Sequence, residues 1–539
     1  MAATDRISPE IRSAERQIDE FYRTNPLFQR PFAEAAWYFL AHCEEVQFRE
    51  HIRGSDFDLQ RQACVIDEIV NNMKWPLRWI RRACRAGGRI PASLPAEPYN
   101  NAWHLFDLAA EYADFENAFT YASLGCIELA LDGDKLVPTS SLRADTRYEA
   151  YDRLVKPVHA KIGSDAVAFL SQIDRTIQVS RDKFAYHLNP KIVGQGMEIV
   201  ATIYPSSILL PSDWCFPRYS IAEVDRVALA LRTLAFIHFR ARIRAAELGC
   251  IGCGYSNAIL VMGTEELQSR VVRYTGVRES RVADVLTDLT FGARGQENAD
   301  PALQPLISLT ETRIAIPPIL VLGSDFRRNF AVLLNRMPAE KAVYSRLNQQ
   351  REELCRDNAR ATFAEAGFRT WNGPWPGRSD LPDIDLVVIC DREKHCLFLE
   401  LKAFIEPAEA REIVQRDEEI AKGIRQGNRL RTAYWHDSTT IRGVLGTDDQ
   451  YAATFVVASE SGIGSCVIQE PSIPVIRVAH LLSAIQAKGS LKELCEWLRR
   501  REFLPLKGIH YEEVTVIKRV GRWELDWYGI KPLIASNFE

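Results

Sequence analysis

Apolar residues recur at intervals of three and four positions along much of the first 190 residues, which predicts helices there. The pattern is clearest in the segments EAAWYFLAHCEEVQF, ACVIDEIVNNMKWPLRWIRRACRA and AFTYASLGCIELALDG. Stretches rich in Gly and Pro, such as AGGRIPASLPAEP, separate these segments. Residues 1–190 are therefore predicted to form a helical domain.

Residues 191–340 carry a mixed pattern. The segment GMEIVATIYPSSILL suggests strands, whereas VDRVALALRTLAFIHFRARIRAAEL has the length and apolar face of a long helix. This middle region is predicted to be mixed α/β or helical.

From residue 341 to residue 539 the pattern changes to alternating helices and strands. A helix ending near Gly367 precedes a loop, RTWNGPWPGRSDLP, and two apolar strands follow within LPDIDLVVICDREKHCLFLELKAF. A helix, PAEAREIVQRDEEIAKGIRQG, comes next, then a strand, YAATFVVAS, and the chain closes with a ribbon, EEVTVIKRVGRWELDWYGI. This order predicts an α/β core at the C-terminal end of a multidomain protein.

The two apolar strands contain four charged residues, Asp383, Asp385, Glu400 and Lys402. Burying charges is costly unless they are paired or bind a metal. Alternate residues of a strand share a face, so pairing of the two strands can bring Asp385 beside Glu400 and Lys402. Glu400-Leu401-Lys402 is also the one acid-x-Lys sequence in the whole chain.

Two carboxylates beside a lysine are suited to hydrolysis of a phosphodiester. Carboxylates hold hard ions such as Mg²⁺ or Mn²⁺ together with waters and substrate phosphates. Lys402 would orient or deprotonate the attacking water, or stabilise the charge that develops on phosphorus. The alternative is an ordinary ion pair at a solvated strand end.

The sequence PDIDLVVIC…LFLELK resembles the core motif of the PD-(D/E)xK, or restriction-endonuclease-like, nuclease superfamily. Members share a small mixed sheet flanked by helices, with an acid opening the second core strand and D/E-x-K on the third. The resemblance covers about residues 340–480. It implies that Asp385 and Glu400 are metal ligands and that Lys402 is the catalytic lysine. Asp383, which follows Pro382, is the alternative first acid.

The same resemblance implies further site residues on the neighbouring helices. Many members carry an acid on the preceding helix, and here Glu353 is favoured as a metal ligand over Glu352 and Asp357. Some members carry Gln or Lys on the helix after the motif. Gln415 is favoured there as a catalytic residue, with Lys422 as the alternative.

Composition limits the partners. A net charge of −4 and a pI near 6.3 give no global nucleic-acid signature, so any such surface must be local. Candidates are the basic, aromatic-rich segments KWPLRWIRRACRAGGR, RQGNRLRTAYWH and WLRRREF, for which an ordinary solvated helix face is the alternative. Cys250 and Cys253 form one Cys-x-x-Cys pair, but a structural zinc site needs two more ligands.

No apolar run of membrane-spanning length occurs, the N-terminus lacks the apolar core of a signal peptide, and the cysteines are scattered. A cytoplasmic protein is therefore expected, with no membrane partner. Together, these features predict a Mg²⁺- or Mn²⁺-dependent endonuclease, with DNA favoured over RNA. Its N-terminal region would recognise a target or join a protein partner or a second copy. A role in restriction or anti-phage defence follows by fold analogy alone, and a catalytically inactive scaffold or nucleic-acid-binding protein is the alternative.

Overall fold

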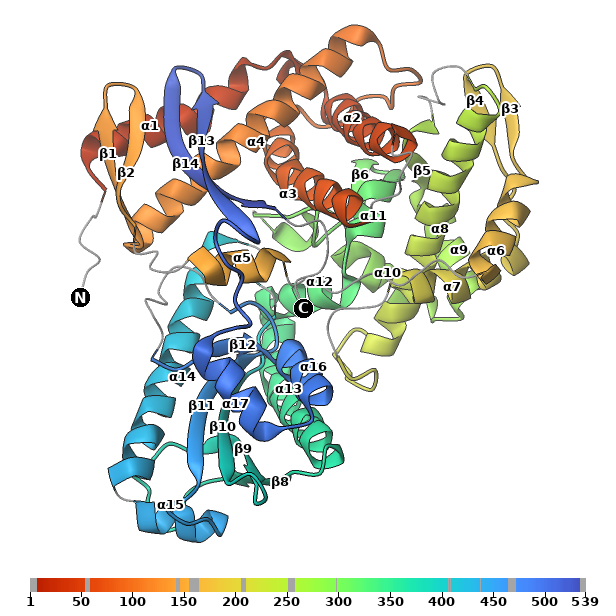
Figure 1. Cartoon of the computed structure of the whole chain (residues 1–539). Helices are drawn as coiled ribbons and strands as arrows, with labels where there is room; N and C mark the ends of the chain where they lie inside the picture. Colours follow the sequence, from red (N-terminus) through yellow and green to blue (C-terminus); the bar gives the residue numbers. More distant parts are fainter. Residues whose placement is uncertain are drawn as a thin grey trace. The chain divides into compact units, whose positions relative to one another are not determined.

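The computed structural model describes residues 7–53, 59–141, 146–154, 164–204, 210–250, 257–296, 298–405, 407, 409–436, 438–463 and 472–533. The chain is multidomain, with a mainly helical N-terminal region and several sheets (Figure 1). It divides into two compact units. Unit 1 comprises residues 1–15, 114–157 and 346–539, and unit 2 comprises residues 16–113 and 158–345. Three helices contribute residues to both units: α1 (Pro9–Glu20), α4 (Ala96–Leu124) and α13 (Pro338–Glu365).

Unit 2 is mostly helical. Its α-helices are α2 (Phe32–Arg53), α3 (Leu59–Ala83), α6 (Ser164–Asp174), α7 (Pro190–Ile203), α8 (Ile221–Glu247), α9 (Thr264–Thr275), α10 (Glu279–Asp288), α11 (Pro318–Gly323) and α12 (Phe326–Arg336). Short 3-10 helices are η1 (Phe21–Thr24), η2 (Pro26–Gln29) and η4 (Ala293–Gly295). The strands β3 (Gln178–Ser180) and β4 (Lys183–Ala185) form a hairpin, and an antiparallel sheet contains β5 (Leu260–Gly263), β7 (Arg313–Ile316) and β6 (Ile307–Thr310) in that order.

The strands predicted at the start of the middle region are wrong for residues 196–203, which belong to α7, and residues 205–209 of that segment lie outside the described residues. Asn189 caps this helix by accepting a hydrogen bond from the Ile192 N–H at 2.9 Å. The buried positions Val193, Ile199 and Val200 have helical spacing, which the high content of β-branched residues concealed.

Unit 1 contains most of the predicted C-terminal core. Its strands are β1 (Ile127–Asp132), β2 (Lys135–Ser141), β8 (Arg369–Gly373), β9 (Ile384–Cys390), β10 (His395–Lys402), β11 (Ala452–Ser459), β12 (Val475–Arg477), β13 (Tyr511–Val520) and β14 (Trp523–Pro532). Its other helices are α5 (Thr146–Leu154), α14 (Ala410–His436), α15 (Ser438–Leu445), α16 (Val478–Lys488) and α17 (Leu491–Arg500). The predicted hairpin, the following helix and strand, and the closing ribbon are confirmed.

Two sequence predictions for unit 1 are corrected. Residues 369–373, expected to lie in a loop, form β8 and pair antiparallel with β9. The last predicted N-terminal helix ends at Leu124, because Gly125 adopts a left-handed conformation with φ of 76° and the chain continues into β1.

The central sheet of unit 1 has the strand order β12-β11-β10-β9-β8. β8, β9 and β10 are antiparallel neighbours, whereas β11 runs parallel to β10 after the crossover through α14 and α15. Figure 1 shows α14 on one side of this sheet and α16 and α17 on the other. Six of the seven β9 residues are buried, as expected for a strand covered on both faces.

A second sheet joins distant segments of unit 1 in the order β1-β2-β14-β13. The helix α5 connects this part to the central core: Tyr151 is fully buried in that core, and its hydroxyl lies 2.8 Å from Nδ1 of His480. Ala150 packs with Tyr511 and Ile530 of the ribbon. The predicted divisions 1–190, 191–340 and 341–539 therefore differ from the two observed units, because residues 114–157 pack with the C-terminal core.

No helix among the described residues has the length and apolar character needed to cross a membrane.

Candidate active site

Asp385 lies where strands β9 and β10 separate. The backbone pairing of the two strands ends at Leu386 and Leu399. Asp385 is the residue before Leu386 on β9, and its carboxylate Oδ2 accepts a hydrogen bond from the Leu401 N–H at 2.7 Å. A side-chain oxygen therefore replaces the backbone acceptor at this point, and the Asp385 carboxylate is fixed against β10.

Glu400 and Lys402 project from the same face of β10. Their side chains form an ion pair, with 2.9 Å between Lys402 Nζ and Glu400 Oε1, and only 14% and 7% of the Lys402 and Glu400 side chains are exposed. Burial, reinforced by the negative charge of Asp385, raises the pKa of Glu400 to about 7, although Lys402 opposes this shift. The three residues predicted as the core of the site are thus brought together.

The first acid is better assigned to Asp385 than to Asp383. Burial raises the pKa of Asp385, and the hydrogen bond from Leu401 and the charge of Lys402 oppose that shift. Asp383 is exposed and precedes β9. Its charge acts on Asp385 as a further weak repulsion.

The helix α14 passes directly over the ion pair. A Cβ placed on Gly423 would lie 3.1 Å from Cε of Lys402 and 3.3 Å from Cγ of Glu400. The next residue back along the helix, Lys422, stabilises the charged form of Glu400. Gln415 is exposed two turns earlier and makes no hydrogen bond or ion pair with a described residue. The geometry therefore favours Lys422 over Gln415 as the α14 residue that serves the site.

On the preceding helix, Glu352 rather than Glu353 faces the carboxylate pair. Partial burial and the charge of Asp385 raise the pKa of Glu352, while Lys402 opposes the shift. Consecutive helical residues point about 100° apart, so only one of the two can face the site. Glu353 is exposed. Arg356, one turn beyond Glu352, stabilises the charged form of Asp385 and was not identified from the sequence.

A buried arginine fixes the chain just after Lys402. Arg351 donates a hydrogen bond from Nη2 to the carbonyl of Phe404 at 2.7 Å and pairs with Glu460. The Glu460 N–H in turn donates to the carbonyl of Lys402 at 2.8 Å. Neither Arg351 nor Glu460 was found by sequence reasoning, because nothing local distinguishes them from other charged residues on their elements.

The donor set suits a hard divalent cation. Asp385 and Glu400 supply carboxylate oxygens on one face, and Lys402 already occupies Oε1 of Glu400. Among the described residues, no group of three or more His, Cys, Asp or Glu side chains is close enough to enclose a metal ion. Two carboxylates, completed by waters and substrate phosphates, are typical of a magnesium site.

The first basic segment has a structural role. Arg78 donates to the carbonyl of Ala299 at 2.7 Å and Arg81 to the carbonyl of Gln296 at 2.8 Å, so the first basic segment supports a neighbouring loop.

Cys250 is buried and Cys253 lies outside the described residues. His238, twelve residues before Cys250, is not available as a zinc ligand in this arrangement, because its ring is held between the Tyr186 hydroxyl and the Asn257 carbonyl.

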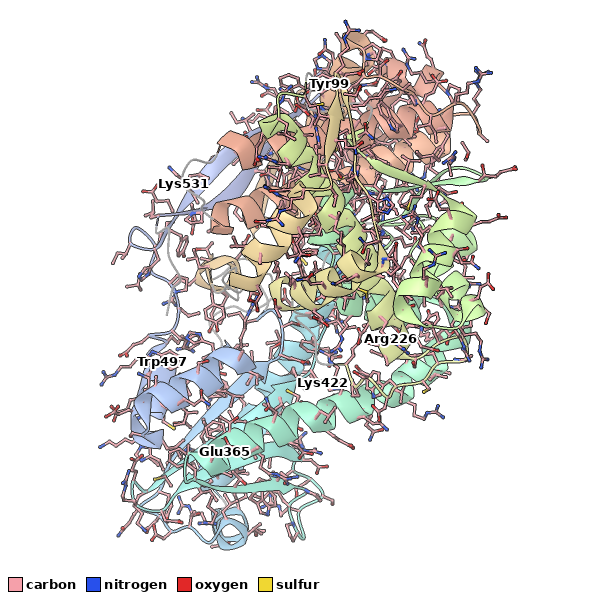
Figure 2. The ribbon with its side chains drawn as sticks, turned by 90° about the vertical axis from the view of Figure 1, so that its right-hand side faces the viewer. Tyr99, Arg226, Glu365, Lys422, Trp497 and Lys531 are labelled. Carbon is pink, nitrogen blue, oxygen red and sulfur yellow. The ribbon has the colours of Figure 1, made fainter. Side chains whose placement is uncertain are left out.

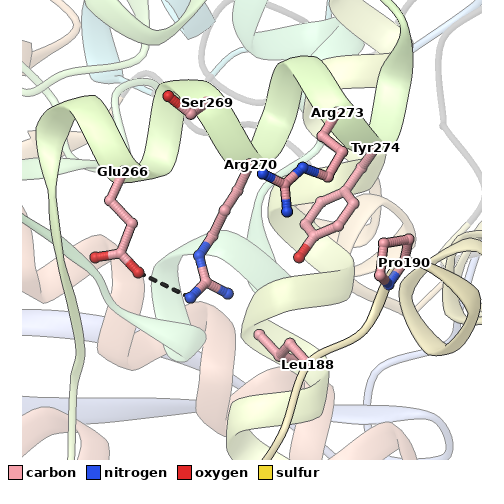
Figure 3. A pocket seen from close by; sticks show the side chains of 7 residues that line it. All are labelled: Leu188, Pro190, Glu266, Ser269, Arg270, Arg273 and Tyr274. Carbon is pink, nitrogen blue, oxygen red and sulfur yellow. Dashed lines mark ion pairs between the residues drawn. The ribbon is translucent and has the colours of Figure 1, made fainter.

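A separate surface pocket of about 260 Å³ lies in unit 2 (Figure 3). Arg270, Arg273 and Tyr274 of α9 line it, and Arg270 is paired with Glu266 at 2.8 Å. The pocket shares no residue with the site formed by Asp385, Glu400 and Lys402. It is lined by a single carboxylate, so it lacks the pair of carboxylates found at that site.

Comparisons with protein-family models, with curated proteins and with solved structures found no match for this chain.

Proposed function

We propose that this protein is a metal-dependent endonuclease that hydrolyses phosphodiester bonds, with DNA as the favoured substrate. The observation that carries the proposal is the convergence of Asp385, Glu400 and Lys402 on one face of the sheet where β9 and β10 separate. Burial raises the pKa of both Asp385 and Glu400, and carboxylates perturbed in this way are typical of functional sites.

The order of the surrounding elements supports the same proposal. A helix, three antiparallel strands, two helices and a parallel strand follow one another as α13, β8, β9, β10, α14, α15 and β11. The acid lies at the start of the second strand and the Glu-x-Lys sequence at the end of the third. This is the arrangement that the resemblance to the PD-(D/E)xK superfamily implies.

Each residue of the site has a separate task. Asp385 and Glu400 would hold Mg²⁺ or Mn²⁺, with Glu352 as the candidate for a further, outer contact. The bound ion would polarise a phosphoryl oxygen and lower the pKa of a bound water. Lys402 would orient the attacking water or stabilise the negative charge on phosphorus.

Plasmid cleavage in Mg²⁺ or Mn²⁺ tests the proposal. We expect wild-type protein to nick or linearise DNA, Glu400→Ala and Lys402→Ala to lose at least 100-fold in rate, as removal of a general acid–base group usually does, and EDTA to abolish cleavage. Lys531→Ala, on the exposed end of β14, is the matched control and should cleave normally. Equal rates for wild type and both site variants would reject the catalytic assignment.

One observation favours the alternative of an inactive nuclease-like scaffold. Lys402 and Glu400 satisfy each other without a cation, as a purely structural ion pair would. The nuclease and the inactive scaffold differ in metal binding, since a purely structural ion pair predicts no calorimetric signal with Mn²⁺. A role in restriction or anti-phage defence rests on fold analogy, and plating of phage on cells that express wild type or Lys402→Ala tests it.

A further inference from the structure

The second half of α14 presents three exposed cationic side chains on one side of the helix. Its exposed residues recur at three- and four-residue intervals and therefore lie on one side of the helix. We call the three cations, Lys422, Arg425 and Arg429, the basic face of α14. The opposite side packs on the sheet through Ile420, Gly423, Gly427, Leu430 and Tyr434.

The charge on this helix is strongly asymmetric. All of its acidic residues, Glu412, Asp417, Glu418 and Glu419, precede residue 420, and none follows up to His436. A helix dipole favours cations only in the last turn, whereas Lys422 and Arg425 lie more than two turns from the end. Complementing the dipole therefore does not explain the basic face.

The cations of the basic face are available to a partner. No hydrogen bond or ion pair joins Lys422 or Arg425 to any residue that the structure describes. Arg429 donates to the backbone carbonyl of Asp380, which leaves its guanidinium with further donors. Arg431, on the adjoining side of α14, is instead used to hold the Ser472 carbonyl at 3.0 Å.

The basic face begins beside the candidate active site. Gly423 packs on Glu400 and Lys402, and Lys422 acts electrostatically on Glu400. Figure 2 labels Lys422 on this helix. With a rise of about 1.5 Å per residue, Lys422 and Arg429 are about 10 Å apart, a span that covers roughly three phosphates of one duplex strand.

We propose that the basic face of α14 binds the sugar–phosphate backbone of the nucleic acid next to the bond that is cut. The inference rests on the proposed nuclease function and names the surface that holds the substrate. Recognition through phosphates alone carries no base sequence, so this contact positions the strand and leaves sequence selection to other parts of the protein.

The test measures binding without cleavage. The full chain is titrated, in EDTA, into fluorescently labelled single-stranded DNA, duplex DNA and RNA of one sequence, between about 50 and about 200 mM salt. We expect Arg425→Gln/Arg429→Gln to bind the preferred probe at least tenfold more weakly. The slope of log affinity against log salt should become shallower by about 1.8 for duplex and about 1.4 for a single strand, since each lost phosphate contact removes about 0.9 or about 0.7.

The matched control removes two arginines elsewhere on unit 1. Arg392 lies in the turn between β9 and β10, at the end of the hairpin away from Asp385, and Arg519 lies on β13; both are well exposed. Arg392→Gln/Arg519→Gln has the same net charge as the test variant and should bind like wild type. Because Arg429 also contacts Asp380, the single variant Arg425→Gln is measured as well. Its salt slope should change by about half as much as that of the double variant.

The outcomes separate this inference from the proposed function. Loss of binding in the test variant but not in the control supports the basic face, even if wild type never cleaves and the nuclease proposal fails. Equal affinity and slope in the two double variants would overturn the basic face, even if wild type cleaves DNA. Failure of wild type to bind any of the three probes would also overturn it.

Discussion

The carboxylate of Asp385 accepts the backbone N–H of Leu401 at the position where the ladder between β9 and β10 has ended. This hydrogen bond gives Asp385 two functions. It gives the Leu401 N–H an acceptor where the backbone pairing of β9 and β10 ends, and it holds the Asp385 carboxylate beside Glu400. Substitutions at this residue should therefore affect stability and metal binding to different degrees.

We expect Asp385→Asn to keep the fold and lose metal binding. The amide oxygen of asparagine can still accept the Leu401 N–H, but the negative charge is gone. Asp385→Ala should lose metal binding and also about 1–3 kcal/mol of stability, because the Leu401 N–H loses its acceptor. Chemical denaturation and calorimetric titration with Mn²⁺ measure the two effects. Equal stability of the two variants would show that the hydrogen bond contributes little.

Glu400 should make the metal-free protein less stable as the pH rises from about 4.5 to about 7. The folded-state pKa of Glu400 is about 7, above its ordinary value of 4.5, so the folded state holds this proton more tightly than the unfolded chain. Between these pH values folding requires proton uptake, and the free energy of unfolding decreases with pH.

Glu400→Gln removes the free-energy cost of carrying a charged Glu400 in the folded state. The variant should be more stable than wild type at pH 8 by roughly 1–3 kcal/mol, with the difference shrinking towards pH 4, where Glu400 is protonated in both states. Urea denaturation in EDTA at both pH values measures the difference. A gap that is independent of pH would indicate that Glu400 does not titrate in this range.

Gly423→Ala should reduce cleavage more than it changes stability. The added methyl group would press on Lys402, Glu400 and Val457 at 3.1, 3.3 and 3.3 Å, while alanine favours the helix by up to about 1 kcal/mol. We expect at least a tenfold loss of cleavage rate, since a displaced lysine loses its alignment. Gly443→Ala in α15 is the control, because nothing lies within 4 Å of its Cβ position. It should raise stability slightly and leave cleavage unchanged.

Tyr151→Ala should destabilise the central core of unit 1, although the residue lies far from that core in sequence. Its ring is fully buried there, and its hydroxyl contacts His480. Loss of a buried aromatic side chain costs about 3–5 kcal/mol. Hydrogen exchange in β9, β10 and β11 should become faster. Tyr528→Phe, which removes only a partly buried contact to Glu149, should leave that exchange nearly unchanged. A fragment of residues 341–539 that is as protected as the full chain would contradict the role given to α5.

The sequence identified the centre of the candidate site because strand geometry is local. Alternation along a strand places Glu400 and Lys402 on one face whatever the rest of the fold. The same rule cannot choose between residues on neighbouring helices. The choice of Glu352 over Glu353, and of Lys422 over Gln415, depends on how each helix is rotated against the sheet.

The pattern of apolar residues by itself determined the hairpin, the helix and strand that follow it, the closing ribbon and the helical character of much of the N-terminal region. Only the tertiary structure decided that residues 114–157 pack with the C-terminal core, that β8 is a strand, and that Arg351 and Glu460 hold the chain beyond Lys402. Local patterns report the period of a single element, whereas these contacts join residues about 20 to more than 300 positions apart. Such contacts form only when several elements pack together and bury apolar surface, so no short window of sequence contains them.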